Sequence, residues 1–239
     1  MTIQTETVDY EHQGTALQGF KAWDDSVPGP RPAVLVSHAW AGRGEFENER
    51  ARDLAELGYT GFALDLYGKG VLGSSVEENQ KLMGPFLEDR AMLQDRLKTA
   101  LDLVRGMPDV DQNHVGAIGF CFGGLCVLDI ARTGEDVDGV VSFHGLFNAP
   151  EVGKADRIKT KILALHGWDD PMAEPDSVVG FAKEMSEAQA DWRLHAYGGT
   201  KHAFTNPNAN DPDLGTVYNE KSADLAWKAM RDFLSECFA

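Results

Sequence analysis

Alternating and continuous apolar segments near the start of the chain predict four strands. Polar and apolar residues alternate over residues 5–10 and 15–22, and a turn at Gln13-Gly14 separates the two segments. Alternation with a period of two across a short turn is typical of a β-hairpin. Two uninterrupted apolar runs follow at residues 33–38 and 60–64. Such runs indicate strands that are buried on both faces of a sheet.

Apolar residues at helical spacing predict helices between and after these runs. Over residues 45–57 they recur every three or four positions, and Gly58 ends the pattern. The stretch 76–107 has a mostly helical pattern as well. Because proline lacks a backbone N–H and clashes with the preceding turn, we expect a break at Gly84-Pro85.

Strands and helices alternate from there to the C-terminus. The predicted strands are residues 115–120, 139–143, 162–166 and 192–197, and the predicted helices are residues 122–132, 176–190 and 221–238. This order implies a mostly parallel central sheet with helices on both faces, preceded by the N-terminal β-hairpin. No long linker or repeat divides the chain, so we expect a single domain over residues 1–239.

The charge balance narrows the range of partners. The chain has 22 basic and 38 acidic residues, which gives a formal net charge of −16. That field repels phosphate backbones and anionic lipids, so we expect neither a nucleic acid nor a membrane partner. Residues 1–10 hold acidic residues and no apolar run, and no segment approaches the roughly 20 apolar residues of a membrane helix. We therefore expect a soluble, cytoplasmic protein.

Cysteine usage agrees with a reducing compartment. Cys121, Cys126 and Cys237 are odd in number and show no C-x-x-C spacing. This pattern predicts neither a disulfide framework nor a zinc site. Cys126 and Cys237 have no catalytic sequence context, and we interpret both as structural.

The most informative segment is the G-x-C-x-G turn from Gly119 to Gly123. It joins a predicted buried strand directly to a predicted helix, with Cys121 at its centre. This is the nucleophile-elbow pattern, with cysteine in place of serine. The nucleophile of such a turn has a strained backbone, and its glycine neighbours leave room for the close approach of strand and helix. A cysteine at a helix N-terminus is also favoured as a thiolate.

An acid and a histidine follow in the order that this type of turn requires. Asp169 and Asp170 come directly after the predicted strand 162–166, and we favour Asp170 because it precedes a proline. His202 lies in a glycine-rich loop after the last predicted strand and is the candidate general base. The alternative for Asp169 is a solvated loop acid.

These residues predict nucleophilic catalysis. His202 generates the Cys121 thiolate, and Asp170 fixes the tautomer of His202 and balances the imidazolium. The thiolate attacks a carbonyl, and the backbone N–H groups of Phe122 and Trp40 are the expected oxyanion donors. His38, His144 and His166 each follow a predicted buried strand. They either line the site or serve hydrogen-bonding roles.

With these residues in place, the sequence resembles the dienelactone hydrolase family of α/β-hydrolases. The resemblance runs from about Ala33 to the C-terminus and rests on LAELGY (54–59), LDLYG (64–68), GFCFGG (119–124) and GTKHAF (199–204). It implies the α/β-hydrolase fold, a Cys-His-Asp triad, no cofactor, and a monomer or weak homo-oligomer. It also implies an enol-lactone substrate from aromatic-ring degradation.

Three positions depart from the pattern of this family. Ala39 stands where the family has a glutamate that helps to activate the thiol, so either His202 acts alone or Glu45 replaces that group. Lys69 and Asn206 stand where the family has two arginines that bind the substrate carboxylate. Lysine lacks the bidentate fork of arginine, and asparagine is neutral. An anionic dienelactone is therefore expected to bind less well.

The expected substrate is a small neutral or aryl ester or lactone. Trp40, Phe122 and Trp168 predict an aromatic pocket of low charge. The predicted substrate contacts are Lys69, Asn206, Ala39, His38, Trp168 and Phe204. Two alternatives stay open, a phosphotriester hydrolase and a non-catalytic binding protein on a hydrolase fold. The second is disfavoured because all three residue types of a triad are present in order.

Overall fold

The computed structural model describes residues 2–239, and eight strands of this part form one sheet. Their order is β1-β2-β4-β3-β5-β6-β7-β8. β2 pairs antiparallel with β1 and β4, whereas β4 pairs parallel with β3, and β7 pairs parallel with β6 and β8. The mostly parallel sheet and the N-terminal hairpin that the residue pattern predicts are therefore both present.

Two compact units make up the chain. One ends at Ala117 and the other begins at Ile118, so the boundary falls inside strand β5. The single domain expected from the sequence stays a prediction.

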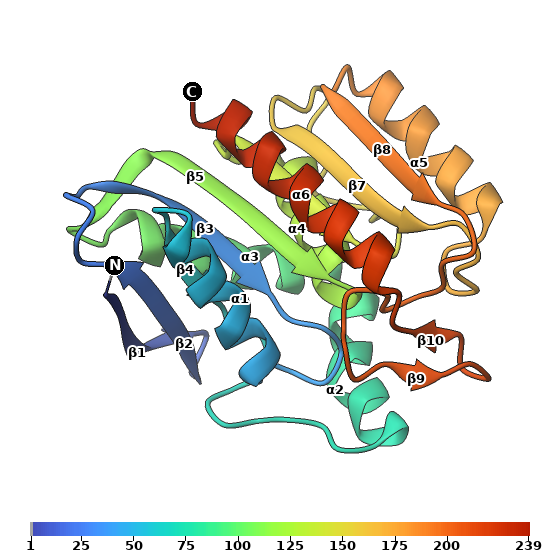
Figure 1. Cartoon of the computed structure of the whole chain (residues 1–239), viewed down its shortest axis with the longest axis horizontal. Helices are drawn as coiled ribbons and strands as arrows, with labels where there is room; N and C mark the ends of the chain where they lie inside the picture. Colours follow the sequence, from blue (N-terminus) through green and yellow to red (C-terminus); the bar gives the residue numbers. More distant parts are fainter. Residues whose placement is uncertain (1) are drawn as a thin grey trace. The chain divides into compact units, whose positions relative to one another are not determined.

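The first unit contains the hairpin and the helices of the N-terminal half. Its elements are β1 (Ile3–His12), β2 (Thr15–Asp24), β3 (Arg31–Ser37), α1 (Glu45–Glu56), β4 (Thr60–Ala63), α2 (Val76–Glu88), α3 (Arg90–Arg105) and most of β5 (Val110–Phe120). Helix α1 packs on β2, β3 and β4 (Figure 1). Residues 33–36 of β3 are completely buried, as their continuous apolar run predicts.

The expected break at Gly84-Pro85 is wrong. Helix α2 continues through Pro85 to Glu88, and the chain breaks at Asp89 instead. Asp89 accepts a hydrogen bond from the backbone N–H of Met92 and so caps the start of α3. Phe86, directly after the proline, is buried against Tyr67 at 5.7 Å between ring centroids. Burial of this ring and the Asp89 cap together place the break one turn later.

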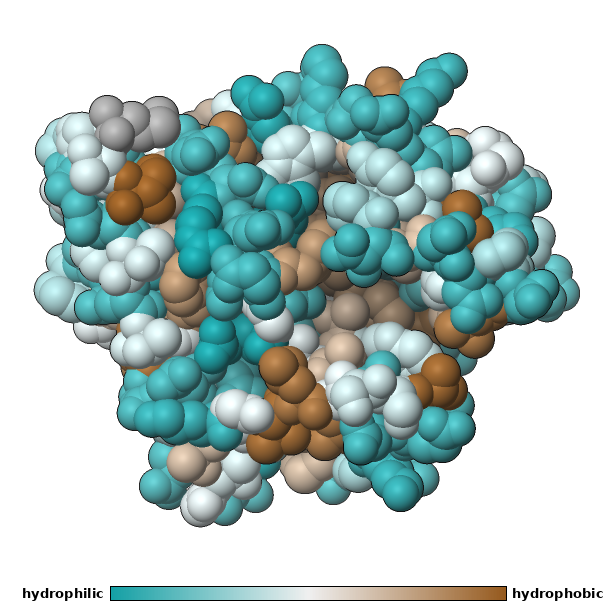
Figure 2. Space-filling view, turned by 60° about the horizontal axis from the view of Figure 1, so that its bottom comes forward, coloured by the Kyte–Doolittle hydropathy of each residue, from teal (hydrophilic) through white to brown (hydrophobic). Residues whose placement is uncertain are grey.

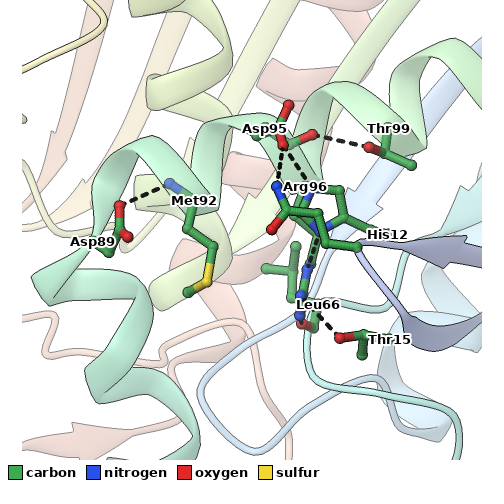
Figure 3. A network of polar contacts seen from close by, with 9 residues as sticks. His12, Thr15, Leu66, Asp89, Met92, Asp95, Arg96 and Thr99 are labelled. Atoms are coloured by element: carbon green, nitrogen blue, oxygen red, sulfur yellow. Dashed lines mark hydrogen bonds and ion pairs between the residues drawn. The ribbon is translucent and has the colours of Figure 1, made fainter.

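A buried arginine joins the hairpin to α3 (Figure 3). Arg96 donates from Nε to Nδ1 of His12 at 3.1 Å and from Nη1 to the Leu66 carbonyl at 2.6 Å. The other ring nitrogen of His12 lies 2.8 Å from Asp95. Since a guanidinium only donates, Nδ1 of His12 is the acceptor, and Nε2–H donates to the Asp95 carboxylate. In the sequence, His12 is only a histidine beside the Gln13-Gly14 turn, because both of its partners lie on α3, more than 80 positions along the chain.

The second unit contains the nucleophile turn and the C-terminal elements. These are α4 (Phe122–Thr133), β6 (Gly139–Phe143), β7 (Lys161–Gly167), α5 (Pro175–Glu187), β8 (Trp192–Tyr197), β9 (Asn210–Asp211), β10 (Thr216–Val217) and α6 (Glu220–Cys237). Helices α4 and α6 cover opposite faces of the strands of this unit (Figure 1).

The short β9–β10 pair was not predicted, because two-residue strands carry no periodicity. It forms within the segment that follows His202, and it holds that histidine in place. The backbone N–H of His202 donates to the Gly215 carbonyl at 3.0 Å, and the Val217 N–H donates to the His202 carbonyl at 3.0 Å. His202 is thus attached to an ordered backbone on both its N–H and its C=O side.

Helix α4 is buried along nearly its whole length, and a buried ion network fixes its C-terminal end. The Arg132 side chain is completely buried and lies 3.2 Å from the Asp129 carboxylate and 2.7 Å from that of Glu184 on α5. Arg132 also donates to the Phe147 carbonyl at 3.0 Å. The guanidinium charge is therefore compensated by two carboxylates inside the unit.

One face of the molecule shows how polar and apolar residues are distributed on the surface. The face in Figure 2 is mostly hydrophilic, with hydrophobic residues in separate patches. The exposed large hydrophobic residues are Val71, Leu72, Val76, Val152, Trp168, Val179 and Leu225. Among residues 2–239, no helix combines the length and the apolar character that a membrane span requires.

Candidate active site

Cys121 occupies the sharp turn between β5 and α4, with a backbone that only a constrained turn maintains. Its φ is 57° and its ψ is −117°, a strained conformation for a residue with a side chain. Its N–H donates to the Phe143 carbonyl at 3.0 Å. A Cβ atom at Gly119 would overlap the Gly123 carbonyl, so strand and helix approach too closely for any other residue at Gly119. The local geometry is that of a nucleophile elbow.

Asp170 and His202 form a buried pair in the same unit. The Asp170 carboxylate lies 2.7 Å from Nδ1 of His202, and both residues are at most 2% exposed. The other carboxylate oxygen accepts the Met172 N–H at 2.8 Å, which fixes the orientation of the acid. Asp169 is exposed instead. Of the two sequence candidates, the structure brings Asp170 to the histidine.

Electrostatics favour the protonated form of His202. Burial, the strongest single influence, lowers the pKa of its imidazole, but the electrostatic influence of the Cys121 sulfur and the hydrogen bond to Asp170 outweigh it. Together these effects raise the pKa of His202 to about 10. A thiolate–imidazolium pair is the form of a cysteine nucleophile that reacts with carbonyl carbon.

Phe122, the first of the two predicted oxyanion donors, is the first residue of α4. It is completely buried and directly follows Cys121, the candidate nucleophile. Backbone N–H groups at a helix N-terminus bind anions, since they point out of the helix along its dipole. This position suits an oxyanion donor next to the reacting sulfur.

The loop after β3 belongs to the first unit, and buried side chains hold its peptide groups. Nε2 of His38 accepts the Leu66 N–H at 3.2 Å, so Nδ1 carries the proton and donates it to the Ala39 carbonyl at 2.7 Å. The carboxylate of Glu47 accepts the Ala39 N–H at 3.3 Å and the Gly44 N–H at 2.9 Å. The Ala39 peptide groups are therefore fixed on both sides.

Trp40, the second predicted oxyanion donor, lies in this loop. Its carbonyl accepts the hydroxyl of Tyr67 at 3.0 Å. Among the described residues, no protein acceptor receives its N–H. That N–H shares a peptide plane with the Ala39 carbonyl, which His38 holds. Its role as an oxyanion donor stays a prediction.

Glu45, the suggested replacement for the missing activating glutamate, is directed elsewhere. Its carboxylate pairs with Arg52 at 2.5 Å and accepts from Asn48, and its side chain is 65% exposed. The buried carboxylate beside Ala39 is that of Glu47. Glu47 occupies the third position of α1 and accepts the N–H of the N-cap residue, Gly44. Because glycine is not a capping-box residue, the sequence had no Ser/Thr-x-x-Glu signature to mark Glu47, and its contact with Ala39 depends on the loop conformation.

The predicted substrate contacts have different surroundings. Lys69 pairs with Asp9 at 2.7 Å on the surface of the first unit. In the second unit, Asn206 caps a turn by accepting the Asn208 N–H at 2.9 Å, and Trp168 is 45% exposed. Phe204 is completely buried. Their contacts with substrate, together with those of Ala39 and His38, stay predictions.

The three histidines that follow buried strands have different environments. His38 and His144 are both hydrogen-bonded through two ring nitrogens. Neither ring nitrogen of His166 has a hydrogen-bond partner among the described residues. Its ring packs against Phe147 at 5.5 Å between centroids. Sequence position alone did not separate these cases, because each depends on residues from other elements.

No group of three or more His, Cys, Asp or Glu side chains among residues 2–239 is arranged to hold a metal ion. The three cysteines are free thiols, with Cys126 and Cys237 buried and Cys121 half-buried. The thiol at the elbow is thus the accessible one.

Comparison with known proteins places the chain in a family. The family model of the dienelactone hydrolase family matches residues 17–238. The chain belongs to the dienelactone hydrolase family. It is accordingly an enzyme that hydrolyses esters or lactones, and the α/β-hydrolase fold expected from the sequence is confirmed.

Relatives within and near this family have similar length and structure. A crystal structure of a dienelactone hydrolase-like promiscuous phosphotriesterase from metagenomic libraries is 34% identical, covers 99% of both chains and has a TM-score of 0.94. A protein from Bradyrhizobium sp. described as a probable 2-oxo-3-(5-oxofuran-2-ylidene)propanoate lactonase is 28% identical over 95% of this chain and 92% of its own. The dienelactone hydrolase from Anabaena variabilis, 23% identical over 99% of this chain and 97% of its own with a TM-score of 0.66, shares the fold.

Proposed function

We propose that the chain hydrolyses neutral or aryl carboxylic esters and lactones with a Cys121–His202–Asp170 triad and a thioester intermediate. The observation that carries this proposal is the buried contact between His202 and Asp170, with His202 under the electrostatic influence of the elbow thiol. Family membership supports ester or lactone chemistry.

The first half-reaction forms the thioester. The Cys121 thiolate attacks the carbonyl carbon, and the carbonyl electron pair moves to oxygen to give an oxyanion. The N–H of Phe122, and that of Trp40 as the second expected donor, stabilise this charge. When the oxyanion collapses, the C–O bond to the leaving group breaks and the His202 imidazolium gives its proton to the leaving oxygen. In a lactone that oxygen stays attached, and the ring opens.

The second half-reaction releases the acid. Neutral His202 takes a proton from water as the water oxygen attacks the thioester carbonyl. The C–S bond breaks, the carboxylic acid leaves, and the thiolate–imidazolium pair is restored. Asp170 holds the imidazole in the tautomer with the proton on Nδ1, so Nε2 is the nitrogen that exchanges protons with sulfur and substrate.

Two observations favour neutral substrates. The charge of Lys69 is already paired with Asp9, and Asn206 is neutral and engaged in a turn. Neither residue offers the bidentate cationic fork that binds a carboxylate strongly. The net charge of −16 also disfavours the approach of an anionic substrate.

The test compares wild type with Cys121→Ala and Cys121→Ser on p-nitrophenyl butyrate, dihydrocoumarin and an anionic enol-lactone. We expect turnover of the two neutral substrates, a lower kcat/KM for the anionic one, and loss of all activity in Cys121→Ala. Mass spectrometry of quenched wild type is expected to find the butyryl group on the peptide that holds Cys121. Full activity of Cys121→Ala on these substrates would overturn the proposal.

A second candidate activity is attack at phosphorus, which the 34% identical promiscuous phosphotriesterase specifically favours. The thiolate would displace p-nitrophenolate from paraoxon, forming an S–P bond as the P–O bond breaks, and water would then hydrolyse the phosphoryl-cysteine. Paraoxon added to the same panel tests this. A p-nitrophenol burst followed by steady release supports turnover, whereas a single burst with a stable adduct indicates inhibition only.

A further inference from the structure

His144 lies between the nucleophile turn and the loop that carries His202. It directly follows β6 and is 2% exposed, with a φ of 38°. Its backbone N–H donates to the Leu165 carbonyl on β7 at 2.8 Å. A non-glycine residue with positive φ that is held by a neighbouring strand indicates a side chain whose placement matters.

The ring of His144 contacts both parts of the site. Nδ1 lies 3.1 Å from the backbone nitrogen of Cys121, and Nε2 lies 2.8 Å from the hydroxyl of Thr205. Thr205 is three residues after His202 in the same loop. One imidazole therefore connects the backbone of the nucleophile to the loop of the base.

These contacts determine the tautomer of His144. A backbone N–H can only donate, so Nδ1 carries no proton and accepts the Cys121 N–H, which it shares with the Phe143 carbonyl. The ring proton is then on Nε2, where it is donated to the Thr205 hydroxyl. Protonation of Nδ1 would place its N–H opposite the backbone N–H of Cys121, and two donors cannot form a hydrogen bond with each other. In neutral His144, one ring nitrogen accepts a hydrogen bond and the other donates one. The imidazolium form would lose the first of these bonds, so these contacts disfavour it.

The neighbour of His144 on the other side is His202 itself. The two ring centroids are 5.1 Å apart with an interplanar angle of 65°, and Phe204 covers His144 at 5.3 Å. Burial lowers the pKa of His144 well below its ordinary value, and the positive charge of His202 lowers it further. Of the two neighbouring imidazoles, His202 is therefore the one that becomes protonated, and His144 stays neutral.

We propose that His144 is a positioning residue, which holds the Cys121 backbone and the Thr205 end of the His202 loop at a fixed separation while it stays uncharged. This inference rests on the proposed function, because it assumes that Cys121 and His202 react as a pair. The consequence is that the thiol proton passes to His202 without competition from a second basic imidazole.

Three variants separate this role from simple packing. His144→Phe keeps an aromatic ring and removes both hydrogen bonds. In His144→Gln the amide oxygen can accept from Cys121 and the amide nitrogen can donate to Thr205. Thr205→Val keeps the branched shape of the side chain and replaces the hydroxyl, which His144 contacts, with a methyl group. His195→Gln, at an exposed histidine on β8, is the matched control.

The first readout is the pH dependence of Cys121 alkylation by iodoacetamide, which needs no ester turnover. We expect His144→Phe to slow alkylation at neutral pH by about 10-fold or more and to shift its pH profile, since misplacement of reacting groups has effects of this size. His144→Gln is expected to stay within about 3-fold of wild type and Thr205→Val to fall between them, while His195→Gln reacts as wild type does. With p-nitrophenyl butyrate, the loss in His144→Phe is expected in kcat rather than KM.

The two proposals fail in different ways. If wild type hydrolyses no ester, the proposed function fails, while the alkylation profiles still test His144. A wild-type profile in His144→Phe, even with a lowered melting temperature, would overturn the positioning role. If His144→Phe does not fold, Thr205→Val is the variant that tests the inference. An unchanged pH profile of Cys121 alkylation and an unchanged kcat in Thr205→Val would count against the positioning role.

Discussion

Nδ1 of His202 lies 2.7 Å from Oδ2 of Asp170, and both side chains are almost completely buried. A carboxylate in this position stabilises the imidazolium and fixes which nitrogen is protonated. The neighbouring acid, Asp169, is exposed and uses its backbone N–H to bind the Thr200 carbonyl. Two adjacent residues of the same type thus have different environments.

Asp170→Asn is expected to lower kcat/KM for p-nitrophenyl butyrate by about 100-fold or more, because the amide no longer balances the imidazolium. Asp169→Asn is the matched control and is expected to retain wild-type kinetics. Both variants are checked for folding by circular dichroism. Equal losses in the two variants would contradict the assignment of the acid.

The His202 ring is expected to stay protonated across neutral pH and to lose its proton only near pH 10, where its raised pKa lies. Because the folded-state value exceeds the ordinary value of 6.5, this group stabilises the fold fully below pH 6.5, and the contribution disappears as the pH rises through 10. Ring ¹⁵N chemical shifts measured against pH report the titration. In Cys121→Ala the thiolate charge is absent, and the pKa of His202 is expected to fall. An identical pKa in both proteins would show that the thiol does not act on this histidine.

Gly119→Ala is expected to destabilise the protein by at least about 2 kcal/mol, because the added Cβ overlaps backbone atoms that cannot move aside. Gly180→Ala lies in the middle of α5 with open space around its added methyl group. That control is expected to stabilise the protein by about 0.5–1 kcal/mol, since alanine is the better helix former. Urea unfolding measures both. An unchanged free energy of unfolding in Gly119→Ala would mean that the turn around Cys121 can move to accommodate the added methyl group.

Arg132→Met is expected to cost about 3–5 kcal/mol in the free energy of unfolding, because it leaves the Asp129 carboxylate buried without its partner. The exposed pair of Lys228 and Asp232 offers the contrast. Lys228→Ala is expected to change the free energy of unfolding by no more than about 0.5 kcal/mol. Urea unfolding at low and high salt distinguishes the two, since only the exposed pair is screened. A loss below 1 kcal/mol in Arg132→Met would contradict the role of this network.

Local sequence determined the secondary-structure elements and pointed to the candidate nucleophile. Periods of two and of about 3.6 residues predicted nearly every strand and helix, because burial on one or two faces acts on residues close together in the chain. Cys121 was found for the same reason, since the glycine spacing, the strand and the helix all lie within a few residues of it. The family resemblance, carried by four short segments, was likewise confirmed.

Only the tertiary structure decided which side chains of the candidate site contact one another. The proline after Asp170 favoured it over Asp169, but only the structure brings Asp170 into contact with His202, 32 positions away. His144 contacts both Cys121 and Thr205, and Thr205 is 61 positions away from it. Glu47, rather than Glu45, supplies the buried carboxylate beside Ala39, because the direction of a helix side chain depends on how the helix packs. Which polar groups meet in the buried site depends on loop conformations, and no local period in the sequence encodes those.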